Sequence, residues 1–180
     1  MFSFLKKKDN IKVTDIVFMK TAAKWHACKQ AFMENADTVF IAWFDDTREQ
    51  LEAFLEEQNT GRMTLILYRE ANIHYTNGKQ VIFLEHYPLH EKEEALYTSL
   101  NLKDIKVFSS LDEALFLHFG GDQIVELMEK MGLQENESIQ HSMIGMALKN
   151  AQQKILEKVT IEQTATSQAE WFKRNISGEK

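Results

Sequence analysis

Short apolar runs alternate with amphipathic segments along most of the chain. Runs rich in β-branched and aromatic residues, as expected of buried strands, lie at 11–19, 38–44, 63–68, 80–87 and 105–108. The segments between them place apolar residues at helical spacing and predict helices over 20–36, 45–58 and 90–100. Because strands and helices alternate, we predict an α/β fold with a mostly parallel sheet flanked by helices. Residues 71–78 end in Asn77–Gly78, a strong turn signal, and are expected to form a loop or a hairpin arm.

After residue 108 the pattern becomes helical. Ser109 and Ser110, each followed three residues later by an acidic residue, form overlapping capping boxes for a helix that ends at Gly120. A second helix over 122–131 ends at Gly132, and a long helix is predicted over 137–159. We therefore expect an α/β domain over 11–135 and a C-terminal helical extension over 136–180, preceded by a tail over 1–10.

The tail, MFSFLKKKDN, has two interpretations. Its apolar part precedes the lysines and is shorter than the apolar core of a signal peptide. The tail is either a frayed start with solvated lysines or a weak membrane contact. In the second case the apolar side chains enter the bilayer and the lysines meet anionic headgroups: Phe2, Phe4, Leu5, Lys6, Lys7 and Lys8.

Composition narrows the class of protein. The net charge is −6 and no block of lysine and arginine lies in the body of the chain, which argues against a nucleic-acid partner. The single cysteine, Cys28, excludes an intramolecular disulfide and fits a reducing compartment. We expect Cys28 to be a small buried apolar residue. These features indicate a cytoplasmic protein, with peripheral contact at the inner membrane if the tail binds lipid.

One stretch carries a specific family resemblance. Residues 109–155 read SSLDEALFLHFGGDQIVELMEKMGLQENESIQHSMIGMALKNAQQKI. They resemble the end of the second nucleotide-binding lobe and the start of the helical scaffold of SecA, the ATP-driven preprotein translocase motor. Weaker resemblance lies at 14–25, with Asp15, Thr21 and Lys24, and at 38–54 and 78–91. The resemblance implies a RecA-like fold of the P-loop NTPase second-lobe type.

The departures from that family concern ATP chemistry. A phosphate loop, GxxxxGK[ST], is missing, because the Gly78–Lys79 pair is followed by Gln80 and sits in a turn. The family's arginine-bearing segments would fall where this chain has YREANIH and EEALYTSLNLK, and no arginine lies between residues 70 and 173. Lysine does not replace the planar guanidinium that stabilises a transferring phosphate. We therefore assign no catalytic residue, no nucleotide-binding residue and no cofactor.

Two segments contain side chains of the kinds that bind metal ions. Asp45 and Asp46 follow an apolar strand as in a Walker B motif, but they are better explained as acids at a helix N-terminus. The segment EHYPLHE, residues 85–91, offers two histidines, and its proline argues against the helical spacing that would bring them together. We expect a strand end and a loop with exposed histidines there, and we assign no metal site.

The sequence favours a non-catalytic SecA-like protein that acts as a protein-interaction module linked to protein export. Its partner would be the export machinery, a motor protein or a second copy of the chain. The expected partner surface is Ile139, Met143, Met146, Ile155, Trp171 and Phe172. The alternatives for these residues are packing on the α/β body, with 166–175 folding back. The alternative functions are an ATP-binding subunit that works with a lobe supplied in trans, and a peripheral membrane-surface protein.

Overall fold

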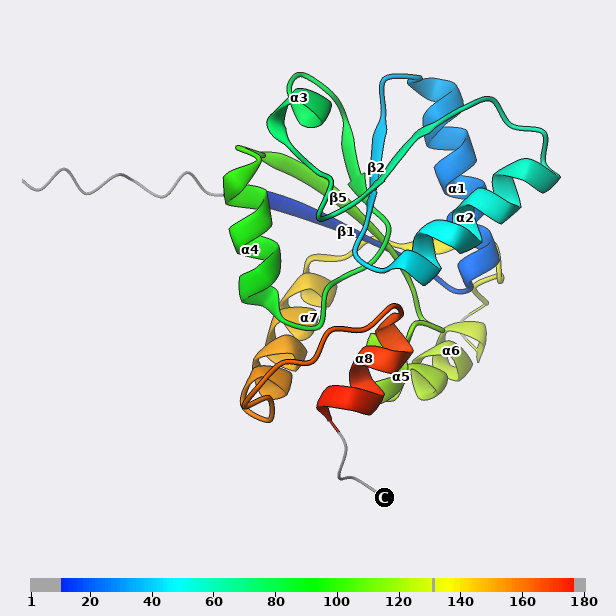
Figure 1. Cartoon of the computed structure of the whole chain (residues 1–180). Coiled ribbons are helices and arrows are strands. Elements are labelled where there is room, and N and C mark those ends of the chain that lie inside the picture. The colour runs from blue at the N-terminus through cyan, green and yellow to red at the C-terminus, as the bar shows by residue number, and fades with distance from the viewer. Residues whose placement is uncertain (1–10, 131, 177–180) are drawn as a thin grey trace, which may run out of the picture.

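A computed structural model describes residues 11–130 and 132–176 of the 180-residue chain. Its described strands form a six-stranded sheet in the order β3-β2-β4-β5-β1-β6 (Figure 1). The strands are β1 (Lys12–Phe18), β2 (Val39–Ala42), β3 (Thr64–Leu67), β4 (Val81–Phe83), β5 (Asp104–Ser110) and β6 (Ser138–Ile139). The first five strands pair in parallel, and β6 joins β1 antiparallel. The predicted α/β class with a mostly parallel sheet is confirmed, and the arrangement is consistent with a RecA-like fold.

Helices cover both faces of this sheet (Figure 1). The helices are α1 (Thr21–Glu34), α2 (Asp45–Glu57), α3 (Ile73–Thr76), α4 (His90–Ser99), α5 (Ala114–His118), α6 (Gly121–Lys130), α7 (Ser142–Leu156) and α8 (Gln168–Asn175). The helices α1 and α2 pack on one face, whereas α4, α5, α7 and α8 pack on the other. Strand β2 shows why: Val39 and Ile41 enter one hydrophobic cluster, and Phe40 and Ala42 enter the other.

Several element boundaries differ from the predicted ones. The long helix begins at Ser142 and not at residue 137, because Ser138 and Ile139 instead pair with the end of β1. Its N-terminus is capped by His141, whose ring accepts a hydrogen bond from Met143 N at 3.2 Å. The region 71–78 contains the short helix α3, and its expected turn is present, with Gly78 at φ 72°.

The predicted capping boxes are only partly formed. Helix α5 begins at Ala114, after an N-cap residue, Glu113, that makes no side-chain capping bond. The Glu113 carboxylate instead accepts hydrogen bonds from the backbone N–H and the hydroxyl of Ser110. Of the two expected boxes, the Ser110–Glu113 pair is therefore the one made, and it fastens the end of β5.

The C-terminal segment shares the core of the α/β body. Leu148 and Ile155 of α7 and Trp171 of α8 belong to the same hydrophobic cluster as the strands. The side chain of Trp171 is fully buried, and its Nε1 donates to Glu162 at 3.0 Å. Glu162 also accepts from the Tyr87 hydroxyl and lies 3.1 Å from Lys92 Nζ. Of the alternatives left open for 166–175, the structure shows the segment folded back on the α/β body, and residues on both sides of position 135 share one core.

This packing corrects part of the expected partner surface. Ile155 and Trp171 are both 0% exposed, so their assignment to a surface for another protein is wrong in this conformation. The sequence alone could not distinguish these uses, because an apolar helix stripe fits a partner and an internal face equally well. Cys28 is buried as predicted, and burial raises the pKa of its thiol to about 12.

None of the helices in the described ranges has the length and hydrophobicity needed to cross a bilayer. The expected membrane-contact residues, Phe2 to Lys8, lie outside the described residues. Their contact with lipid therefore stays a prediction.

Candidate functional site

The candidate site lies around four residues that follow the central strand β4, Leu84 to Tyr87. In parallel α/β sheets, ligands bind at the carboxyl ends of the strands, and β4 ends here beside β2 and β5. Leu84, Glu85 and His86 are buried, and Tyr87 is half-buried. Each of the four residues contacts a different part of the chain. The polar groups that remain available for a ligand at the carboxyl edge of the sheet therefore depend on this segment.

A buried lysine holds the first of these residues. Lys24 of α1 is 2% exposed, and its Nζ donates to the backbone oxygen of Leu84 at 2.8 Å and to Glu113 Oε1 at 2.5 Å. Burial raises the pKa of Glu113, and the charge of Lys24 opposes that shift. Nearby, the Asp112 carboxylate accepts from Thr21 N and from the Thr21 hydroxyl. These contacts tie the start of α1 to the end of β5.

Glu85 occupies a place that suits an anion. Its carboxylate accepts hydrogen bonds from Trp43 N at 3.1 Å, Phe44 N at 3.2 Å and the Thr47 hydroxyl at 2.5 Å. These donors surround the N-terminus of α2, where free N–H groups and the helix dipole favour negative charge. Burial raises the pKa of Glu85 to about 7, and the charge of Lys24 opposes that shift. The protein thus fills this anion-binding position with its own side chain.

Helix α8 covers the same edge. Gln168 accepts a hydrogen bond from Leu115 N at 2.6 Å and donates one to His86 O at 3.0 Å. A hollow of about 250 Å³ remains beneath it, and its described lining includes one cation, Lys24, and four carboxylates: Asp46, Glu85, Asp112 and Glu113. The electrostatic character of this edge is therefore acidic.

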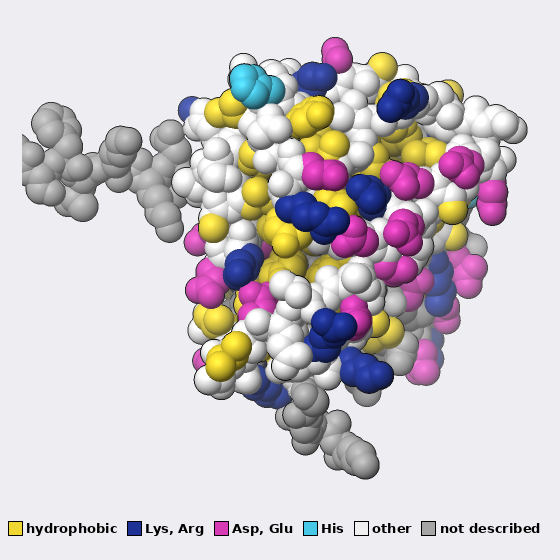
Figure 2. Space-filling model, in the orientation of Figure 1, with side chains coloured by type: hydrophobic (Ala, Val, Ile, Leu, Met, Phe, Trp, Pro, Cys, Tyr) yellow, Lys and Arg dark blue, Asp and Glu magenta, His cyan; other side chains and the backbone are white. Residues whose placement is uncertain are grey.

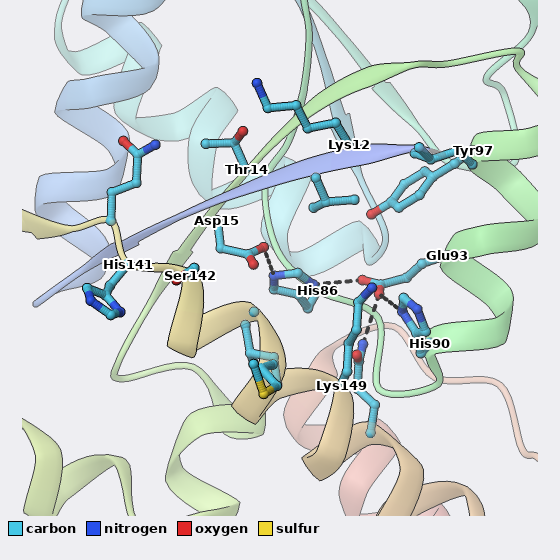
Figure 3. A pocket seen from close by; sticks show the side chains of 17 residues that line it. Lys12, Thr14, Asp15, His86, His90, Glu93, Tyr97, His141, Ser142 and Lys149 are labelled. Atoms are coloured by element: carbon cyan, nitrogen blue, oxygen red, sulfur yellow. Dashed lines mark hydrogen bonds and ion pairs between the residues drawn. The ribbon is translucent and has the colours of Figure 1, made fainter. Parts of the chain in front are cut away.

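A second polar cluster lies on the face covered by α4 and α7 (Figure 3). The His86 ring stands between two carboxylates, with Nδ1 2.9 Å from Glu93 Oε1 and Nε2 3.0 Å from Asp15 Oδ1. The contact with Asp15 is an ion pair whose angle departs from that of a hydrogen bond. Glu93 also accepts from Tyr87 N, Gln152 Nε2 and the His90 ring. Glu93 therefore joins the segment after β4 to both α4 and α7.

The charges of this cluster are fixed by their neighbours. Burial alone would lower the pKa of His86, but the charge of Glu93 and the contacts with Asp15 outweigh it and raise the pKa to about 10. Burial alone would raise the pKa of Glu93, but the charge of His86 and the hydrogen bonds to Glu93 lower it to about 2. A cationic imidazole cannot accept a proton, so His86 is unsuited to act as a general base near neutral pH.

Asp15 is held in place by the close approach of α7. A Cβ atom at position 145 would overlap the Asp15 carboxylate, so this position of the helix accepts only glycine without a shift. Beside this contact lies a hollow of about 600 Å³ between β1, α4 and α7. Asp15, His86 and Glu93 form its buried inner wall (Figure 3).

The structure agrees with the prediction for Asp45 and Asp46 but differs from the prediction for EHYPLHE. Asp45 and Asp46 lie in the first turn of α2 as predicted, and Asp45 pairs with Arg69 at 2.6 Å. The expectation of exposed histidines in EHYPLHE is wrong for His86, which is 4% exposed, whereas His90 is half-buried beside Glu93. No group of three histidine, cysteine or acidic side chains within 11–130 and 132–176 is placed to hold a metal ion.

The remaining residues of the expected partner surface differ in their exposure to solvent. Met143 and Met146 of α7 are 68% and 64% exposed. Ile139 is half-buried in β6 opposite Val17, and the Phe172 ring packs 4.9 Å from the ring of His118. The structure therefore brings Met143 and Met146 together on one exposed stretch of α7 and separates them from the others.

Sequence reasoning missed the partners that complete the two clusters. Glu93, Gln152 and Gln168 are polar residues on predicted helices, where solvent exposure is the usual outcome. The EHYPLHE segment was the signal available, since it places a carboxylate and an imidazole directly after an apolar strand. Gln152 and Gln168 are 59 to 82 residues away from the groups that they bond, Glu93 and the His86 backbone, and no local pattern reveals those pairs.

Comparison with known proteins identifies a SecA-related segment. No protein-family model matches the chain. A segment of 50 residues is 42% identical to protein translocase subunit SecA 1 of Alkaliphilus metalliredigens and 46% identical to SecA of Endomicrobium trichonymphae and of Christiangramia forsetii. Each match covers 28% of this chain but only 4% to 6% of the SecA protein. The similarity therefore supports relatedness over that segment.

The His86 network should give the folding stability a defined pH dependence. The pKa of His86 rises from 6.5 to about 10 on folding, so its stabilising contribution is complete below pH 6.5 and is lost as the pH rises through about 10. At pH 6 we expect His86→Gln to lower the free energy of unfolding by about 3–5 kcal/mol, because two buried carboxylates lose their counter-charge. Urea denaturation should show this difference from the native chain shrinking between pH 6.5 and 10.

The control for this prediction is His26→Gln, which removes an exposed histidine outside the network. At the acid end the sign reverses. The pKa of Glu93 falls from 4.5 to about 2 on folding, so its contribution is complete above pH 4.5 and is lost as the pH falls through about 2. A His86→Gln penalty that stays constant or grows up to pH 10 would show that His86 is not held as a cation.

Proposed function

We propose that this chain is a non-catalytic SecA-like protein that binds another protein in the pathway of protein export. The 50-residue similarity to SecA supports the link to translocation. A likeness in fold or in one segment does not give an activity, so the similarity supports only the link to export, and the non-catalytic and interaction parts of the proposal rest on the site.

The observation that carries the non-catalytic part is the acidic carboxyl edge. A nucleotide triphosphate bound there would meet Glu85 on the N-terminus of α2 and would face Asp112 and Glu113. Glu85 already takes the N–H groups that a phosphate would need. Burial alone would raise the pKa of Asp112, but its hydrogen bonds lower it, so the negative charge of Asp112 would repel a triphosphate more strongly in a partly buried hollow than in water. Lys24, the cation in the described lining, is engaged by Leu84 and Glu113, and α8 covers the edge through Gln168.

The interaction part is supported by exposed apolar side chains on α7. Met143 and Met146 remain largely exposed, whereas Leu148 and Ile155 of the same helix pack in the core. Methionine side chains are flexible and polarisable, and they serve as adaptable contacts in protein-binding surfaces. We infer that the partner is a component of the export machinery, a motor protein or a second copy of the chain, and that the protein works on the cytoplasmic side of the membrane. Acidic and basic side chains are interspersed on the face seen in Figure 2, which does not suggest a nucleic-acid surface.

The first test is a calorimetric titration of the purified full chain with ATP and Mg²⁺. We expect no saturable heat up to about 1 mM nucleotide, because the carboxylates of the edge repel the triphosphate. Saturable binding in the micromolar range would contradict the proposal. It would favour the alternative in which the chain binds ATP beside a lobe supplied in trans.

The second test concerns the exposed methionines. Tagged protein and a Met143→Glu/Met146→Glu variant would be used to capture partners from an extract, with sedimentation velocity on each to detect self-association. We expect the charged variant to lose specific partners or the dimer, since it places two carboxylates in the apolar contact. Met33→Glu, at a residue 73% exposed on α1, is the matched control and should behave as the native chain. Identical partners and identical oligomeric state in all three proteins would remove α7 as the contact surface.

A further inference from the structure

Strand β1 is paired on one side only over most of its length. Its pairing with β5 runs from Lys12 to Phe18, whereas β6 pairs only with Val17 and Phe18. Between Lys12 and Ile16 the outer side of β1 therefore has no strand partner within the described part of the chain. An unpaired strand edge presents backbone N–H and C=O groups that can pair with another extended chain.

The hydrogen bonds identify which groups face outward. Lys12 N donates to Lys103 O beside β5, whereas Met19 N donates to Glu137 O on the opposite side. Backbone groups of successive residues in a strand point alternately to its two neighbours. Even-numbered residues of β1 therefore bond to β5, and the N–H and C=O groups of Val13 and Asp15 face the open side.

The hollow of about 600 Å³ follows this open side. Lys12 and Thr14 point to one face of β1 and Asp15 to the other, and all three line the same hollow (Figure 3). Side chains on opposite faces of β1 can line the same hollow only if the hollow extends along the open edge of the strand. Its far wall is α7, because the chain leaves the sheet at His141 to begin that helix. The space left is the one that a continuation of β6 would occupy.

The accessible charge of the hollow is positive. Lys12 and Lys149 are exposed on its rim, and the exposed His141 ring lies beside them. The carboxylates in its lining, Asp15 and Glu93, share the single positive charge of His86 between them, so the lysines leave the lining with a small net positive charge. The exposed Met146 adds an apolar contact beside the cations. An extended segment with acidic and apolar side chains fits this combination.

We propose that β1 accepts an acidic, extended segment of a protein partner, which adds to the sheet as an antiparallel strand in line with β6. This inference rests on the proposed function as a partner-binding protein and names the chemistry of the segment that is bound. Main-chain hydrogen bonds from Val13 and Asp15 would hold the segment, and the rim cations would select its sequence. Charge argues against a second copy, since two β1 edges would bring the rims with Lys12 and Lys149 together. It also argues against the chain's own tail, which carries Lys6, Lys7 and Lys8.

The test uses a capped seven-residue peptide of alternating valine and glutamate, with the full chain labelled with ¹⁵N. We expect binding that slows hydrogen exchange at the amides of Val13 and Asp15, while the amide of Thr14, already paired with β5, changes little. A peptide with lysine in place of glutamate should bind at least about tenfold more weakly. A glutamate peptide N-methylated on the edge that pairs with β1 should also bind at least about tenfold more weakly.

Variants on the protein side separate charge from fold. Lys12→Glu/Lys149→Glu should weaken peptide binding by about tenfold or more, since both side chains are exposed on the rim. The matched pair on α7 is Lys149→Glu alone, which should weaken binding, and Lys154→Glu, which makes the same charge change outside the hollow and should leave the affinity within about twofold. Circular dichroism establishes that each variant is folded before its affinity is compared.

Each other outcome overturns the inference. Equal binding of the lysine peptide would show that the rim does not select charge, and exchange slowed at Thr14 in place of Val13 and Asp15 would show that the edge is not used. Val13 and Asp15 amides already protected in the free protein would mean that the edge is covered. A dimer in sedimentation velocity would then show that a second copy covers the β1 edge. Faster exchange of these amides after deletion of residues 1–8 would show that the tail covers it. If the peptide does not bind while Met143→Glu/Met146→Glu loses its partners, this inference falls and the proposed function stands.

Discussion

The structure depends on the hydrogen bonds and ion pairs of four consecutive residues, Leu84 to Tyr87, that follow the central strand β4. These residues are the partners of buried polar groups from six other elements. The backbone oxygen of Leu84 binds Lys24 of α1, and the Glu85 carboxylate binds the N-terminus of α2. The ring of His86 lies between Asp15 of β1 and Glu93 of α4. The backbone oxygens of His86 and Tyr87 accept from Gln168 of α8 and Gln152 of α7. Removing one partner from such a network leaves a buried polar group unpaired, which costs more than the bond itself contributes.

These contacts explain why the carboxyl edge of this parallel sheet, where related folds bind ligands, is occupied by side chains of the protein itself. The positions where parallel α/β proteins bind anions are the helix N-termini at the carboxyl ends of the strands. In this chain a carboxylate from β4 takes one such position, and α8 packs Trp171 and Gln168 across the edge. On the side of β1, where β6 is short and α7 turns away, the sheet leaves backbone hydrogen-bonding groups open. If β1 accepts a partner strand, as we propose, contact with other molecules occurs at the side of the sheet and not at the ends of its strands.

Much of the fold follows from the sequence, because strands and helices with clear periodicity are specified locally. The alternation of apolar runs and amphipathic segments predicted β1 to β5 and the helices α1, α2 and α4, but not the short α3, and Asp45 and Asp46 marked the start of α2. The order of strands and the short β6 were not predictable, since pairing of Ile139 with Val17 depends on chain segments far apart. The same limit applies to the site. A histidine after a strand is usually exposed, and only the arrival of Asp15 and Glu93 makes His86 a buried cation. Ile155 was predicted to lie on the apolar stripe of the long helix, but its burial in the same cluster as Trp171 depended on the return of α8.

The central claim is that α8 and the carboxyl edge form one closed unit with the sheet. Native-state hydrogen exchange of the full chain tests it directly by comparing the opening free energies of the amides of Trp171, Tyr87 and Leu84. The account predicts that all three exchange only through global unfolding, with equal free energies, because Gln168 and Trp171 are part of the same buried network as β4. Exchange of the Trp171 amide through an opening at least about 2 kcal/mol easier than that of Leu84 would contradict the account. It would mean that α8 is a cover that leaves the edge without unfolding the sheet.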